Sequence, residues 1–326
     1  MRRWLLIGIP VVLLLYTTIV MLYTDHEPEL FNVQDAAATH AVNHGHNRVT
    51  GYVTTATLIE VGDVLLNKRG GYLSNDVMPP WVFLDNMPNW EFGVVTQLRD
   101  LARTLRNDIS RSQTQSTEDP DLTIADPQFH FDTSSWLIPR TENEYREGLE
   151  AVERYIERLT AADQPDAQFY ARADNLRDWL ALVEKRLGSL SQRLSASVGQ
   201  QRLNTDLGGD PEARQSTATP EEQIIKTAWV EIDDVFFEAR GTTWVLIHFL
   251  RAIQVDFEQV LEKKNAVVSF RQIIRELEAS QEPLHSPMVL NGSAFGLFAN
   301  HSLVMANYIA RANAAIIDLR NLLEQG

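Results

Sequence analysis

LRDWLALVEKRLGSLSQRL, residues 176–194, is the stretch that decides the fold class of this chain. Its apolar residues are spaced by four and three positions in alternation, which is the heptad pattern of a helix with a single apolar seam. A dimeric coiled coil normally needs more repeats than this stretch contains, so we expect an antiparallel helical hairpin inside one domain. The seam consists of Leu176, Leu180, Val183, Leu187, Leu190 and Leu194.

Helical spacing recurs on both sides of this stretch. Asn89 is a suitable N-cap for a helix that reaches about Ile109. Thr141 and Glu144 have the spacing of a capping box for the next helix, to about Leu159. Strand signals are weak throughout. We predict an all-α protein, a multi-helix bundle with long irregular loops such as 110–140, whose other helices cover 53–67, 224–264, 266–280 and 293–323.

The N-terminal segment predicts a membrane helix. Residues 4–23 carry no charge and follow Arg2 and Arg3. A helix of about 20 residues matches the thickness of a bilayer core. The apolar region of a cleaved signal peptide is shorter, and no cleavage motif follows, so we favour an uncleaved signal anchor in residues 1–24. The two arginines place the N-terminus in the cytoplasm and the body on the far side of the membrane.

Composition changes along the chain suggest how the body is divided. Residues 25–50 are polar and small, as in a tether or a short helix. A first helical half follows at 51–198, and a second occupies 224–326. The segment between them, 199–223, is rich in Gly, Pro, Ser and Thr, and we expect it to be a crossover. Its mobility and the oligomeric state of the chain are left open.

Charge and missing motifs exclude several functions. The formal net charge is −15, which argues against nucleic acid as a partner. Cysteine is absent, so thiol catalysis and Cys-ligated metals are excluded. The chain lacks the serine-hydrolase elbow, the S-x-x-K pair, the H-E-x-x-H motif and the glycine-rich nucleotide loops. We therefore predict no cofactor, assign no catalytic residue and favour a role other than catalysis.

Arginines on the helix that follows Asn89 form the best candidate for a binding surface. Arg99, Arg103 and Arg106 are spaced to share one helix face, and Arg111 could extend the cluster. Guanidinium groups on one face could bind a phosphate, a lipid headgroup, an anionic glycan or a protein partner. The favoured alternative is that they pair with carboxylates of the same chain, such as Asp100, Asp108, Glu118 and Asp119.

Histidines give a weaker signal. His40 and His44 have the spacing with which a helix presents two imidazoles to a metal, and His46 follows. Gly45 makes such a helix doubtful, and no acidic residue lies close in the sequence, so we predict no metal site. His248 and His301 fall on apolar helix faces, where a hydrogen-bonded core histidine is the usual finding.

Several stretches of the chain together carry a family resemblance. They include GYLSNDVMPP, LDNMPNWEFGVVTQLRDLARTLRND, SRSQTQSTEDPDL, AQFYARADNLRDWL, RLGSLSQRLSASVGQ, FFEARGTTWVLIHFLRA and LNGSAFGLFANHSLVMANYIARANAAIIDLR. Through them the chain resembles a domain-of-unknown-function family of bacterial proteins with a single N-terminal inner-membrane anchor and a helical periplasmic domain. The resemblance extends over nearly all of the chain beyond the tether. It implies a bacterial inner-membrane location with the body in the periplasm, and it supplies no activity, cofactor or catalytic residue.

These observations predict a non-catalytic envelope adaptor or scaffold that holds a protein partner near the membrane. Two alternatives stay open. One is an envelope hydrolase or transferase, acting on peptidoglycan, glycan or lipid with carboxylate and Arg residues of the 72–140 region. The other is ligand binding between helices without chemistry, which would need an enclosed apolar cavity.

Overall fold

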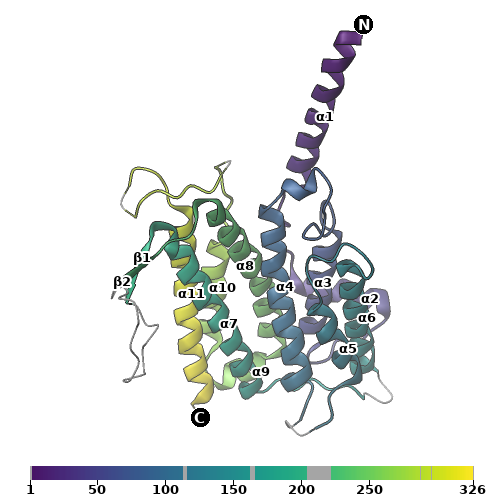
Figure 1. Cartoon of the computed structure of the whole chain (residues 1–326). Coiled ribbons are helices and arrows are strands. Elements are labelled where there is room, and N and C mark those ends of the chain that lie inside the picture. The colour runs from purple at the N-terminus through teal and green to yellow at the C-terminus, as the bar shows by residue number, and fades with distance from the viewer. Residues whose placement is uncertain are drawn as a thin grey trace, which may run out of the picture.

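The computed structural model describes residues 2–112, 116–161, 166–203, 222–286, 288–294 and 296–325, with the backbone alone at 2–7, 202–203 and 223. The described chain is almost entirely helical (Figure 1), which confirms the all-α class. Its small sheet pairs β1 (Gln200–Leu203) with β2 (Glu222–Ile225) in antiparallel register. Among the residues described, no helix combines the length and the apolar character needed to cross a membrane.

Helices α4 (Asn86–Thr104) and α8 (Ile232–Asp256) form the centre of the body. They pack closely because each carries a glycine at the crossing. A Cβ on Gly241 would overlap the carbonyl oxygen of Trp90, and one on Gly93 would overlap that of Glu238. Helix α8 runs through Gly241 without interruption, and the missing side chain allows the close backbone contact.

On one side of this pair, α7 (Ala173–Ser195) packs along α11 (His301–Glu324). All residues of the heptad seam are buried, as expected. The expected hairpin is wrong, because the partner of α7 is the last helix of the chain. Arg320 pairs with Glu184, and Ser191 donates to the carbonyl of Ala306, so the two helices run antiparallel. The same side includes α9 (Glu258–Lys263) and α10 (Val267–Ala279).

On the other side, α3 (Tyr52–Asn67) packs against α8, α6 (Thr141–Thr160) and α2 (Val33–His44). Residues 25–50 thus contain a helix, α2, that buries Val33, Ala37 and Ala41. Helix α5 (Pro120–Phe129) lies between α4 and α6. One hydrophobic core continues through both sides of the body. The division into two sequence halves stays a prediction.

Several helix boundaries differ from the sequence-based expectation. The 110–140 segment contains α5, whose N-cap Asp119 accepts from the backbone N–H groups of Asp121 and Leu122. Helix α4 begins earlier than expected, with Asp85 as its cap, and ends in a π-helical turn, η2 (Leu105–Ile109). The prediction of a capping box at the start of α6 is wrong, because the Thr141 hydroxyl donates to the carbonyl of Asp132 instead.

The expected helix 224–264 is divided. Its start belongs to β2, followed by the short turn η4 (Trp229–Glu231); α8 ends at Asp256 and α9 is separate. Similar short turns, η1 (Trp81–Phe83) and η3 (Ala196–Val198), precede α4 and β1. Of the expected crossover 199–223, residues 204–221 lie outside the described residues, as do 113–115 of the loop after η2.

Candidate functional site

The segment from residue 25 to residue 31, which we call the strap, joins α1 (Arg2–Thr24) to α2 and is fastened along α8. Glu27 forms an ion pair with Arg240, with Arg240 Nη2 at 2.6 Å from Oε2. One helical turn on, Trp244 donates its indole N–H to the carbonyl of Glu29 at 3.3 Å. A further turn on, His248 accepts from the backbone N–H of Phe31 at 3.1 Å. The strap therefore follows one face of α8.

Arg240 is the most heavily engaged residue of the strap region. Its side chain is buried, and its Nη1 donates to the carbonyls of Ser280 at 3.2 Å and Glu282 at 3.0 Å. Gln281 in turn donates to the carbonyl of Arg240 at 3.1 Å. A buried guanidinium needs a counter-charge and several acceptors, and Glu27 and these carbonyls supply them. Arg240 thus ties the strap to the segment after α10.

An open cleft of about 760 Å³ lies between the strap, the start of α8 and residues 281–286 and 288–289. Its lining includes the acidic residues Asp25, Glu29 and Asp233 and apolar residues such as Trp244 and Leu284. Burial raises the pKa of Asp25, and the nearby Asp85 and Glu27 add smaller increases. The hydrogen bond from the Asn86 amide lowers this pKa and offsets part of the rise. The cleft therefore offers both carboxylates and apolar side chains to a ligand.

The predicted arginines lie together on the side of the body where α4 meets α5. Arg99 donates to the carbonyls of Phe129 at 2.6 Å and Phe131 at 2.8 Å, which satisfies carbonyls at the end of α5. Arg103 donates to Nε2 of His130 at 2.5 Å.

Arg106 and Arg111 contact α5 and the residues that lead into it. Arg106 binds Glu118 Oε2 at 2.8 Å and Asp126 Oδ2 at 3.1 Å. Arg111 lies 3.9 Å from Glu118 and donates to the carbonyl of Ser116. The expected pairing with Glu118 is confirmed. The expected pairings with Asp100 and Asp119 are wrong, since those carboxylates bind Arg186 and Arg158. All four arginines have partners within the chain, so a ligand is not needed to explain them; their binding role stays a prediction.

The sequence comparison gives the family. Residues 1–326 match the family described as uncharacterized proteins conserved in bacteria (DUF2333). The chain belongs to this bacterial family. The resemblance expected from the sequence is confirmed at that level, and it assigns no activity. No curated protein and no solved structure matches the chain.

In this DUF2333 protein, both histidines on apolar helix faces are hydrogen-bonded as expected. His248 is fully buried, and its Nδ1 donates to the carbonyl of Trp244 at 2.7 Å. Burial lowers the pKa of His248 to about 3; the hydrogen bond with Trp244 opposes this shift, and the nearby Arg251 adds to it. His301 accepts from the backbone N–H of Leu290 at 2.9 Å, and burial lowers its pKa.

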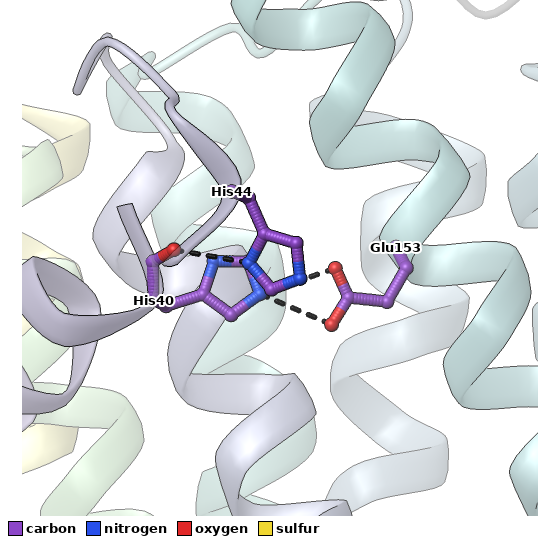
Figure 2. Close-up of side chains that lie close together, drawn as sticks. All are labelled: His40, His44 and Glu153. Atoms are coloured by element: carbon purple, nitrogen blue, oxygen red, sulfur yellow. Dashed lines mark hydrogen bonds and ion pairs between the residues drawn. The ribbon is translucent and has the colours of Figure 1, made fainter. Parts of the chain in front are cut away.

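His40 and His44 lie beside α6 (Figure 2). His40 and His44 lie on the last turns of α2, and Gly45 follows them as the C-cap in a left-handed conformation. Glu153 of α6 approaches Nε2 of His40 at 3.0 Å. Sequence reasoning missed this carboxylate because 113 positions separate it from His40. The histidine spacing was visible in the sequence, but nothing there connects it to Glu153.

Proposed function

We propose that this protein is a membrane-anchored envelope adaptor: α1 enters the bacterial inner membrane, the body rests on the periplasmic side, and the cleft holds a segment of a protein partner. The observation that carries the proposal is the grouping of exposed large apolar side chains at the end of the body from which α1 leaves. Soluble proteins seldom expose such groups together unless they contact a membrane or another protein.

Helix α1 supports the membrane part of the proposal. It projects away from the body in Figure 1, and its side chains from Ile9 to Leu22 are largely exposed. The uncharged run of the sequence, from Trp4 to Tyr23, covers nearly all of α1. With a length of 23 residues, α1 is about 35 Å long, enough to cross a bilayer core.

Exposed apolar residues also precede helices that start at the end of the body from which α1 leaves (Figure 1). Phe83, in η1, precedes the start of α4, where Asn86 donates to Asp25 at 3.3 Å. Trp229, in η4, precedes the start of α8. This end of α8 lies beside the start of α4, because Asn89 of α4 donates to Asp234 of α8 at 2.7 Å. The exposed fractions are 68% for Phe83 and 81% for Trp229, with Phe298, just ahead of α11, at 76%. In our proposal these side chains insert at the lipid interface.

The cleft supports the adaptor part. It opens beside the strap, so a partner bound there is held next to the membrane. Its acidic and apolar lining residues favour a protein segment that carries both Lys or Arg and apolar side chains. The partner surface we first predicted, around Arg99 and Arg106, is less suitable because those guanidinium groups already bind acceptors of the chain. The strap contacts fix the cleft relative to α1.

The enzyme alternative has less support. It relies on residues 72–140, and among the described residues of that region only Asn86 lines the cleft. We therefore retain the adaptor as the function that this geometry supports best.

Site-directed photo-crosslinking in intact cells tests the adaptor proposal. A photoreactive residue at Met288, which lines the cleft, should give a reproducible crosslink to one envelope protein. The same residue at Val268, an exposed position at the start of α10, is the matched control and should give none. Equal crosslinking at both positions, or none at Met288, would contradict the proposal.

Membrane fractionation tests the anchor separately. Replacement of Leu13 and Ile19 by Asp places two charges in the exposed surface of α1 and should release the chain from alkali-washed membranes. Retention of this double variant would show that α1 is not what holds the protein to the membrane.

A further inference from the structure

His40 and His44 lie four residues apart on α2, so they present their imidazoles on the same face of the helix. Glu153 lies opposite them on α6, and Figure 2 shows the two rings and the carboxylate directed toward one another. One ligand atom from each of the three residues lies within 4.8 Å of the others. Residues from two helices thus converge on a space that one ion could fill.

Partners around the two imidazoles orient them as in a metal site. The Nδ1–H of His44 donates to the carbonyl of His40 at 3.0 Å, which leaves Nε2 with a free lone pair. The Nδ1 of His40 is 2.7 Å from the hydroxyl of Tyr52, and its Nε2 faces Glu153. Metal-ligating histidines usually hold their second ring nitrogen in such a hydrogen bond, which fixes the ring and its tautomer.

The contact between Nε2 of His40 and the carboxylate of Glu153 requires a proton or a cation between the nitrogen and the oxygens. Both carboxylate oxygens lie close to Nε2, at 3.0 and 3.1 Å, and an imidazole lone pair at that distance would repel them. In the metal-free chain a proton on Nε2 fills this role. A metal ion can replace that proton, because metal binding at histidine and proton binding compete for the same lone pair.

We infer that His40, His44 and Glu153 form a binding site for a divalent transition metal, with Zn²⁺ as the best match. Two imidazoles and one carboxylate are a ligand set that Zn²⁺ uses when it keeps a further position open. Hard cations such as Mg²⁺ prefer oxygen ligands alone. Two more carboxylates add negative charge nearby: Glu60 of α3 acts on His40, and Glu157 of α6 on His46.

A metal ion bound at this site would have a structural role, because the site lies between two segments of the chain. α2 directly follows the strap, and α6 belongs to the body, so a bound ion would link the segment after α1 to the body through coordinate bonds. This role does not depend on the adaptor proposal, because it concerns neither the cleft nor the membrane.

Zinc binding to the detergent-solubilised full chain tests the inference. After incubation with Zn²⁺ and desalting, the wild type should retain one equivalent of zinc by elemental analysis. His44→Gln and Glu153→Gln should each bind at least 10-fold more weakly in competition with a chromophoric chelator. His285→Gln removes an exposed imidazole on the segment after α10 and should bind like the wild type. Equal affinities in all four proteins, or no retained zinc in the wild type, would overturn the inference.

Thermal unfolding separates loss of a ligand from loss of the fold. His44 is exposed, and its removal leaves the contacts of His40 with Tyr52 and Glu153 in place, so His44→Gln without metal should melt like the wild type. Added Zn²⁺ should raise the melting temperature of the wild type and of His285→Gln, because it binds the folded state. It should not raise that of His44→Gln, and Mg²⁺ should raise none of them. A zinc-dependent rise of the same size in His44→Gln would count against these ligands.

Discussion

Phe31 contacts His248 in two ways: its backbone N–H donates to Nε2 at 3.1 Å, and its ring stacks on the imidazole with the centroids 3.9 Å apart. Because Nε2 must accept this hydrogen bond, His248 has to be neutral, with its proton on Nδ1, which donates to Trp244. The attachment of the strap to α8 therefore depends on the protonation state of one buried imidazole.

Acidification should weaken the fold through His248. Its pKa is lowered to about 3 in the folded protein, against an ordinary value near 6.5 in the unfolded chain. The unfolded state then binds the extra proton first, so the stabilisation is complete above about pH 6.5 and is lost as the pH falls toward 3. The loss is at most about 5 kcal/mol from this group. Urea unfolding of the full chain in detergent between pH 7 and pH 4 measures it.

His248→Gln is the control for this pH dependence. Glutamine has no titrating group, so the free energy of unfolding of the variant should change less between pH 7 and pH 4 than that of the wild type. The comparison is needed because buried carboxylates, such as Asp256 with its pKa raised by burial, change stability in the opposite direction. Identical pH profiles for the two proteins would show that His248 is not the group responsible.

Replacement by alanine should have opposite effects on stability at Gly241, which lies where α8 crosses α4, and at Gly188, which lies outside that crossing. Gly241→Ala places a methyl group on the carbonyl of Trp90 and should lower the free energy of unfolding by about 3 kcal/mol, since this backbone cannot yield. At Gly188, on α7, the nearest atom to an added Cβ is 3.6 Å away, so Gly188→Ala should raise it by about 0.5–1 kcal/mol. Denaturant unfolding of both variants checks the pair, and a neutral Gly241→Ala would contradict the close crossing.

Helical periodicity predicted the fold class and the buried seam of α7, because both are set by local spacing. It failed where tertiary contacts decide. Thr141 has the right position for a capping box but bonds to the loop before it. Helix α5 was missed although Asp119 and Pro120 are helix-start residues, because Pro127 within the helix disturbs the apolar period. The partner of α7 could not be read from the sequence, since α11 lies more than a hundred residues further along the chain.

The candidate sites follow the same rule. The histidine pair and the arginine stripe were visible as spacings on single helices. Their partners were not, because Glu153, Glu118 and the α5 carbonyls come from other segments. Sequence reasoning could therefore name residues with the right chemistry but could not say which of them are already satisfied within the chain.

Lys68 and Glu91 form a buried ion pair that should be costly to break. Glu91 also accepts from the backbone N–H groups of Leu73 and Ser74, each at 2.8 Å, and is fully buried. Glu91→Gln leaves the Lys68 charge without its counter-ion and should lower the free energy of unfolding by about 3–5 kcal/mol. Replacing both residues, as Lys68→Met with Glu91→Gln, should restore part of this loss. A single variant as stable as the wild type would contradict a buried pair.

Arg106 and Arg103 form a matched pair for deciding what the arginine stripe does. Arg106→Ala removes the partner of Glu118 and of the nearly buried Asp126, and should lower the free energy of unfolding by about 1–2 kcal/mol. Arg103 is exposed and contacts only His130 among the bonds described, so Arg103→Ala should cost less than about 0.5 kcal/mol. Binding to vesicles that contain an anionic lipid should be unchanged in both, because these guanidinium groups already have acceptors in the chain. Weaker vesicle binding by Arg103→Ala at unchanged stability would instead favour the stripe as an anion-binding surface.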